Sequence, residues 1–241
     1  QGHGQAAAVV GEPGIGKSRL FWEFTHSHHT QGALVLESAS VSHGKATAYL
    51  PLADLLREYF RIEGRDDARQ AAEKVTGKVL MLDRALEPHL SALMALIDVP
   101  VEDPAWVGLE AHQRRRETVE AARRLLLRES QHQPLVLVFE DLHWLDSETQ
   151  AFLDGLVESI PTAQVLLLVN YRPEYQHGWS QKTYYTQLRL DPLPQASAAE
   201  LLAALLGADP SLDPLKSLLI TRTEGTSTPP STLSRGTSGT S

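Results

Sequence analysis

Short runs of consecutive apolar residues alternate along this chain with longer stretches in which apolar residues recur every three or four positions. Runs of the first kind predict buried β-strands, and stretches of the second kind predict amphipathic α-helices. The predicted strands cover residues 6–10, 33–37, 135–139, 165–170 and 187–190. The predicted helices cover residues 17–30, 49–62, 111–131 and 149–159, with two more between 66 and 99. Because strands and helices alternate, we expect an α/β fold with helices on both faces of a mostly parallel sheet. In this sheet, residues 135–139 should form a central strand.

The C-terminal part of the chain has a different pattern. Pro192 and Pro194 interrupt the sequence, and residues 198–206 and 212–221 have the spacing of two short helices. From Thr226 onward Ser, Thr, Pro and Gly dominate, and they bury too little apolar surface to form a core. We therefore predict a core domain over residues 1–194, the start of a truncated helical lid over 195–225, and a disordered tail over 226–241.

The loop after the first predicted strand carries the clearest chemical signal. Its sequence GEPGIGKS fits the pattern G-x-x-x-x-G-K-[ST] and stands between a predicted strand and a predicted helix, as a P-loop does. Gly14 and Gly16 let the backbone curl so that its N–H groups face phosphates, and the helix adds its positive N-terminal end. Lys17 should neutralise the β- and γ-phosphates of ATP, and Ser18 should ligate Mg²⁺. The predicted nucleotide-binding residues are Gly11, Glu12, Pro13, Gly14, Ile15, Gly16, Lys17, Ser18 and Arg19. The alternative is a glycine turn with an incidental lysine, which the full pattern and its context disfavour.

Two adjacent carboxylates follow the predicted strand over residues 135–139. Ligands bind at the C-terminal edge of parallel sheets, so Glu140 and Asp141 are placed to act on a nucleotide. We assign Glu140 to Mg²⁺ and Asp141 to accepting a proton from the attacking water. The alternative is a pair of solvated carboxylates at a strand end, and the P-loop upstream favours the functional interpretation.

The amino-acid composition and the net charge limit the partners and the cellular location that we expect. The net charge of -8 offers no basic field for nucleic acid or anionic lipid. No cysteine is present, which excludes disulfide scaffolds and thiolate zinc sites and agrees with a reducing compartment, so we expect a cytoplasmic location. The apolar runs are shorter than the roughly 20 residues of a membrane helix, so no membrane partner is expected. The chain lacks a starting methionine and begins almost at its first strand, which indicates a piece of a longer protein.

Three ordered segments connect these observations to a known family. GEPGIGKSRL, FEDLHWLDSETQAFLDGL and VLLLVNYRPEY resemble the signal-transduction (STAND, AAA-like) P-loop ATPase module found beside class III cyclase domains and in large LuxR-type regulators. The resemblance implies a P-loop NTPase core of five parallel strands, a helical lid, and a switch between ADP-bound and ATP-bound forms that acts on output or effector domains.

The same resemblance assigns individual residues. It matches Lys17 and Ser18 to the phosphate and metal residues, and Glu140 and Asp141 to the acidic pair, where many members have aspartate first. It implies that Arg172 is a catalytic sensor contacting the γ-phosphate, whereas a plain surface arginine is the alternative. For His143, Trp144 and Asp146 we favour a packing role. The chain departs from the family where Thr223-Glu224-Gly225 runs into a Ser/Thr/Pro segment.

The expected function is binding of Mg·ATP with slow hydrolysis, serving as a regulatory switch in a larger signalling protein. A module that senses nucleotide without hydrolysing it is one alternative, and a P-loop kinase that phosphorylates a small acceptor is another. We expect this 241-residue chain to hydrolyse ATP more slowly than a version with longer flanks.

Overall fold

The computed structural model describes residues 3–40, 47–192, 195–207, 209 and 212–224. The chain divides into two compact units, residues 1–190 and residues 191–241. All of the candidate site residues lie in the first unit.

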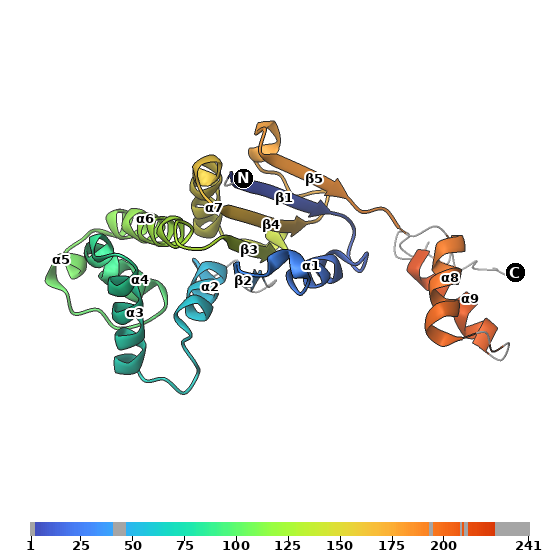
Figure 1. Ribbon diagram of the computed structural model, residues 1–241, viewed down its shortest axis with the longest axis horizontal. Helices are drawn as coiled ribbons and strands as arrows, with labels where there is room; N and C mark the ends of the chain where they lie inside the picture. The colour runs from blue at the N-terminus through green and yellow to red at the C-terminus, as the bar shows by residue number, and fades with distance from the viewer. Residues whose placement is uncertain (1–2, 41–46, 193–194, 208, 210–211, 225–241) are drawn as a thin grey trace, which may run out of the picture. The chain divides into compact units, whose positions relative to one another are not determined.

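The first unit is built on a five-stranded parallel sheet with the strand order β2-β3-β4-β1-β5. The strands are β1 (Gln5–Val10), β2 (Leu34–Ala39), β3 (Leu135–Glu140), β4 (Val165–Tyr171) and β5 (Tyr185–Arg189). The α/β fold and the parallel sheet flanked by helices are confirmed (Figure 1). The strand expected to be central, β3, lies between β2 and β4 and pairs with both in parallel, so it is an interior strand as predicted.

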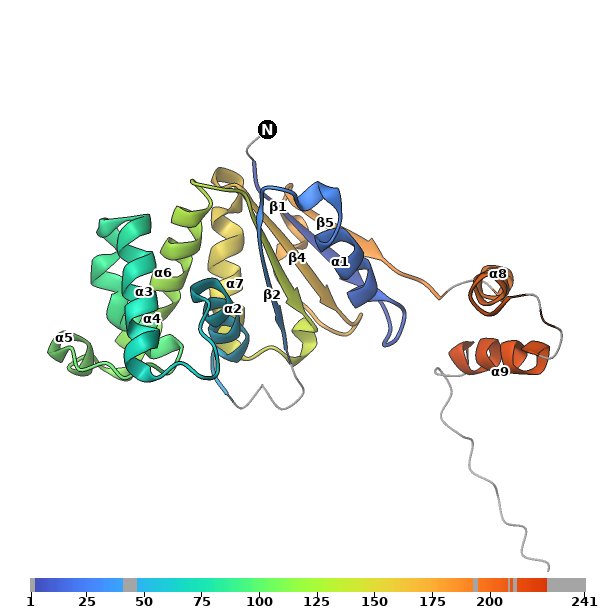
Figure 2. The ribbon, with the colours of Figure 1, turned by 60° about the horizontal axis from the view of Figure 1, so that its bottom comes forward.

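Helices cover both faces of the sheet, as Figure 2 shows for α1 on one side and for α6 and α7 on the other. Helix α1 (Lys17–Thr25) packs Phe21 and Phe24 against one face. The main core lies against the other face, where five helices pack together. These helices are α2 (Leu50–Phe60), α3 (Ala68–Leu82), α4 (Leu90–Leu96), α6 (Ala111–Glu129) and α7 (Ser147–Ser159).

Short helical segments complete the first unit and account for differences from the sequence pattern. Helix α1 ends at Thr25 rather than at residue 30, because the side chain of Ser27 caps a separate turn, η1 (His28–Thr30), by accepting from the N–H of His29. The segment α5 (Pro104–Val107) was not predicted and begins at the cap residue Asp103. The other short segments are η3 (Arg84–His89), η4 (Leu142–Trp144), η5 (Ile160–Thr162) and η6 (Trp179–Gln181).

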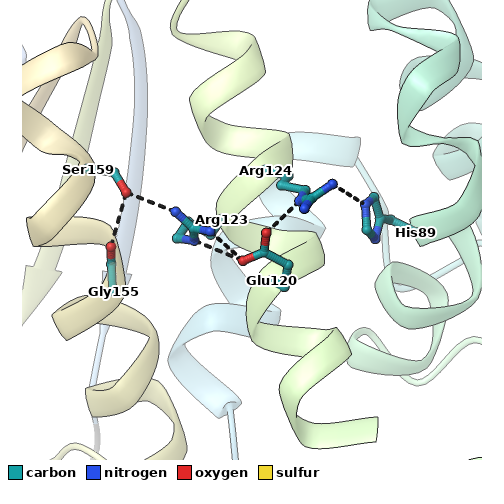
Figure 3. Close-up of polar contacts among 6 residues, drawn as sticks. All are labelled: His89, Glu120, Arg123, Arg124, Gly155 and Ser159. Carbon is teal, nitrogen blue, oxygen red and sulfur yellow. Dashed lines mark hydrogen bonds and ion pairs between the residues drawn. The ribbon is translucent and has the colours of Figure 1, made fainter. Parts of the chain in front are cut away.

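Charged side chains on α6 join it to the elements on either side (Figure 3). Arg124 pairs with Glu120 one turn earlier at 2.5 Å and its Nη1 lies 3.4 Å from His89 of η3. Arg123 pairs with the same carboxylate and donates to Ser159 of α7 at 3.0 Å. These contacts tie the helical layer to α7, which follows the acidic pair in the chain.

The strand register brings the chemically interesting residues to one edge of the sheet. Val10 pairs with Tyr171, and Phe139 pairs with Val169, so β1, β3 and β4 end side by side. The chain connects β1 to β2 at one edge of the sheet and β4 to β5 at the other edge. The connections that follow the neighbouring strands β1 and β4 therefore run in opposite directions, and the ends of these two strands form a topological switch point. Ligands bind at such points in open parallel sheets.

The second unit contains α8 (Gln195–Leu206) and α9 (Asp213–Glu224), which pack against each other. The two helices expected in this part of the chain are therefore present, and their assignment to a lid stays a prediction. Gly225 and the predicted disordered tail over 226–241 lie outside the described residues. Within the residues that the structure describes, no helix combines the length and the apolar character needed to cross a membrane.

Candidate functional site

The loop between β1 and α1 has the backbone that an anion site requires. Gly14 and Gly16 have φ values of 78° and 101°, in the left-handed region where other residues are strained. Gly16 is also the N-cap of α1 and provides no side chain to cap the helix. The first N–H groups of α1 are therefore directed at the loop without a side-chain partner at the cap, and the helix dipole adds positive charge there.

Lys17 lies at the base of this loop with 7% of its surface exposed. Its Nζ donates to the carbonyl oxygens of Gly11 at 2.8 Å and Glu12 at 2.9 Å. Since an ammonium group has three protons, one donor remains for a phosphate oxygen. Burial lowers the pKa of Lys17, and the nearby carboxylate of Asp141 acts in the opposite direction.

Ser18 and Glu140 bring two oxygen atoms together beside Lys17. The Ser18 hydroxyl donates to Glu140 Oε2, and the same carboxylate oxygen accepts from Asn170 Nδ2 at 2.9 Å. Hydroxyl and carboxylate oxygens are hard ligands that suit Mg²⁺, which takes one or two from the protein and the rest from phosphate and water. Among the described residues no group of three or more His, Asp or Glu side chains is placed to hold a metal.

Asn170 is a site residue that the sequence analysis missed. It is fully buried at the end of β4, and while its Nδ2 donates to Glu140, its Oδ1 accepts from the N–H of Asp141 at 2.8 Å. Asp141 itself has a φ of 57°, so this bond supports a backbone conformation that is costly for a residue with a side chain. A polar residue ending the apolar run VLLLVN was the available signal.

A cavity of about 330 Å³ opens where these residues meet. It is lined by Pro13, Gly14, Gly16, Lys17, Ser18, Arg19, Asp141 and Arg172. Arg172 is thus brought to the P-loop, and its guanidinium carbon lies 5.7 Å from the centre of the Trp144 ring. The remaining predicted residues do not line the cavity: Gly11 and Glu12 accept from Lys17, Ile15 is half-buried in the loop, and Glu140 accepts from Ser18.

Asp146 has a structural task that explains its place after the acidic pair. Its carboxylate caps α7 by accepting from the N–H groups of Glu148 and Thr149, at 3.0 and 2.9 Å, and from the hydroxyl of Thr149. It also accepts from the N–H of Tyr49 at 3.1 Å. One buried carboxylate therefore fixes the starts of both α7 and α2.

Comparison with known proteins agrees with this geometry. A sequence profile of the AAA ATPase domain matches residues 1–169. An uncharacterized protein of Rhizobium meliloti (strain 1021) is 26% identical over 201 residues, and the match covers 80% of this chain and 18% of that protein. The chain thus spans less than a fifth of the length of this curated relative.

A comparison with solved structures finds the Drosophila ORC bound to DNA, with 10% identity and a TM-score of 0.38 over 93% of this chain and 45% of that chain. Another is a STAND protein with a tetratricopeptide repeat sensor from Pyrococcus horikoshii, with 12% identity and a TM-score of 0.33 over 87% and 28%.

The matched profile includes β1, the P-loop, β3 with its two acidic residues, and most of β4, and it ends before Asn170 and Arg172. It extends over more than half of the chain, and the resemblance to an AAA-like P-loop module is confirmed. By sequence profile and by the arrangement of its P-loop, this chain belongs to the AAA ATPase domain family.

Proposed function

We propose that this chain binds Mg·ATP in the P-loop cavity and hydrolyses it slowly, as a regulatory switch within a larger signalling protein. The observation that carries the proposal is a continuous hydrogen-bonded path from Ser18 through Glu140 and Asn170 to Asp141. This path joins the phosphate-binding loop to the residue proposed as the base. A purely structural glycine turn has no need of such a connection.

Each part of the cavity has a distinct task in this proposal. Lys17 and the N-terminal end of α1 hold the phosphates, and Ser18 and Glu140 hold Mg²⁺, which when bound neutralises charge on the phosphate oxygens. Asp141 orients the attacking water and accepts its proton. Arg172, which shares the cavity with Lys17, contacts the γ-phosphate and balances the charge that develops there.

The regulatory part of the proposal has a different basis from the chemistry. Its support is the resemblance to modules of multidomain regulators and the short share of the curated relative that the chain covers.

The experiment follows the fate of the γ-phosphate. Purified chain is incubated with Mg·ATP, and bound nucleotide, ADP and inorganic phosphate are each measured, with EDTA as the metal control. We expect binding together with slow, Mg²⁺-dependent release of inorganic phosphate. Binding without phosphate release would favour the non-hydrolysing sensor, and recovery of the γ-phosphate on an added small acceptor would favour the kinase. Absence of nucleotide binding by the folded chain would contradict the proposal.

A further inference from the structure

His143 lies two residues after Asp141 in the short segment η4, and its ring is enclosed without a hydrogen-bond partner among the residues that the structure describes. Its side chain is 8% exposed. Neither ring nitrogen makes a hydrogen bond to any residue that the structure describes. A buried polar group without a hydrogen-bond partner costs free energy, so an unpartnered imidazole is an unusual neighbour for Asp141 unless it acquires a partner in another state.

The rest of this loop is well satisfied. The N–H of Asp141 is bonded to Asn170, and the N–H of Trp144 donates to the carbonyl of Asp141 at 2.8 Å. The imidazole is therefore an exception within an otherwise ordered turn. An apolar side chain of similar size would fill the same space without that cost.

The charges facing His143 come from three parts of the site. They are Asp141 in its own loop, Arg172 and Glu174 after β4, and Lys17 in the P-loop. Burial, and then the positive charge of Arg172, lowers the pKa of His143, so the ring is neutral near neutral pH. A neutral imidazole has one N–H donor and one acceptor nitrogen.

The distance to the proposed base is short. His143 Nδ1 lies 3.9 Å from Asp141 Oδ1, roughly 1 Å beyond a normal hydrogen bond. The Asp141 side chain is 44% exposed and has room to turn, whereas the imidazole is held by its surroundings. An approach of roughly 1 Å between the two atoms would make the contact.

We propose that His143 is a positioning residue, whose Nδ1–H donates to Asp141 Oδ1 in the nucleotide-bound state and leaves Oδ2 directed at the attacking water. This inference rests on the proposed function, because it assumes that Asp141 is the base. The bond restricts the carboxylate to one rotamer at the moment when its orientation matters, and it supplies the missing partner of the buried donor.

Three substitutions at this position separate positioning from packing. His143→Leu fills the space without a donor, His143→Asn keeps an N–H near the position of Nδ1, and His143→Gln moves the amide to the position of Nε2. We expect His143→Leu to lower kcat for ATP hydrolysis by about 10-fold to 100-fold with the affinity for Mg·ATP unchanged, since orientation is lost and binding is not. His143→Asn should recover most of the rate, and His143→Gln should not.

The matched control is His132→Leu, which removes an exposed histidine just before β3, at the opposite edge of the sheet. It should leave kcat unchanged. The melting temperature of His143→Leu should equal or exceed that of the parent chain, because the substitution removes an unpartnered polar group. Equal losses of rate in all three His143 variants, or no loss in His143→Leu, would overturn the positioning role.

A spectroscopic measurement tests the inference even if the chain does not hydrolyse ATP. Nitrogen-15 NMR of the histidine rings, with the His143 signals identified by their loss in His143→Asn, reports which ring nitrogen carries the proton. With Mg²⁺ and a non-hydrolysable ATP analogue bound, His143 should be protonated at Nδ1 in the parent, and its Nδ1 signal should shift in Asp141→Asn. Protonation at Nε2 in that complex would overturn the inference. A parent chain with the Nδ1–H signal but no phosphate release would instead reject the proposed hydrolysis alone.

Discussion

Asn170 shows how much of the site depends on one side chain. It is the only asparagine in the sequence, and its amide donates to one acidic residue and accepts from the backbone of the next. The acidic pair was predictable because it ends an apolar run, but the partner of that pair was not. Its role depends on β3 and β4 pairing in register, and sequence spacing alone does not reveal which strands are neighbours.

Asn170→Ala should weaken both the fold and the activity. It leaves the N–H of Asp141 and an oxygen of Glu140 without their buried partner, which costs about 1–3 kcal/mol. Urea unfolding should report a loss of this size, and phosphate release should fall with it. As a control, Gln164→Ala removes an exposed amide just before β4 and should change neither quantity. Parent-like stability in Asn170→Ala would mean that the hydrogen bonds of Asn170 to Glu140 and Asp141 do not stabilise the fold.

The two acidic residues should respond differently to removal of charge. Glu140→Gln should weaken Mg²⁺-dependent nucleotide affinity, because it removes the charge of the proposed metal ligand. Asp141→Asn should keep that affinity and lower turnover by about 100-fold or more, the usual range for loss of a general base. Calorimetry with and without Mg²⁺, combined with phosphate release, separates the two effects. Parent-like turnover in Asp141→Asn would reject the base, and unchanged Mg²⁺ dependence in Glu140→Gln would reject the metal ligand.

At the scale of elements, the sequence pattern located the strands well and the helix ends less well. Apolar runs such as LVLVF become β3 because buried parallel strands are apolar on both faces. The end of α1 was misjudged because Ser27 caps a separate turn, a local hydrogen bond that competes with helix continuation. The order of strands in the sheet could not be predicted from the sequence, because it depends on where each crossover connection places the next strand.

Asp146 at the start of α7 should contribute more stability than an ordinary helix cap. Asp146→Ala removes the cap and also the bond to Tyr49, so we expect a loss of about 2–3 kcal/mol. Asp67→Ala is the matched control, since Asp67 caps the exposed start of α3 without a link to another element. Thermal unfolding of both variants gives the comparison. A smaller loss for Asp146→Ala than for Asp67→Ala would contradict the bridging role.

The connection between β4 and β5 should make stability depend on pH. Its His177 lies among aromatic rings, where Nδ1 accepts from the N–H of Trp179 at 3.0 Å and Nε2 lies 2.7 Å from the Tyr171 hydroxyl. Burial lowers the pKa of His177, so the unfolded chain binds a proton more readily than the folded chain. The stabilisation is therefore fully present above the unfolded pKa of about 6.5 and is lost as the pH falls below it.

Melting temperatures of the parent and His177→Phe at about pH 7.5 and pH 5.5 measure this contribution. The parent should lose more stability than the variant on acidification, since Phe fills the aromatic space but cannot be protonated. His89 and His143, whose pKa values are also lowered by burial, stay present in both proteins and do not affect the difference. An equal loss in the two proteins would exclude His177 as the source.

At the scale of the whole molecule, the fold serves to bring three chain segments together. The P-loop, the end of β3 and the end of β4 are far apart in the sequence, and the parallel register places them around one cavity. The P-loop and the acidic pair were recognisable from the sequence because each is a short pattern in a fixed context. The hydrogen bonds of Asn170 to Glu140 and Asp141, and the enclosure of His143, could not be predicted from the sequence, because both depend on how the strands assemble into the sheet.

The central claim is that this cavity holds a nucleotide through Lys17, and calorimetric titration of Mg·ATP tests it most directly. Lys17→Ala removes the buried cation and leaves the glycine backbone of the loop in place. Lys182→Ala is the control, because Lys182 pairs with Glu158 at 2.6 Å and does not line the cavity. The account predicts that the parent and Lys182→Ala bind alike. It also predicts that Lys17→Ala loses about 10-fold to 150-fold in affinity, since a charge-assisted hydrogen bond contributes roughly 1.5–3 kcal/mol and Lys17 has one donor left for a phosphate oxygen. A folded Lys17→Ala protein that binds Mg·ATP as tightly as the parent would contradict the account.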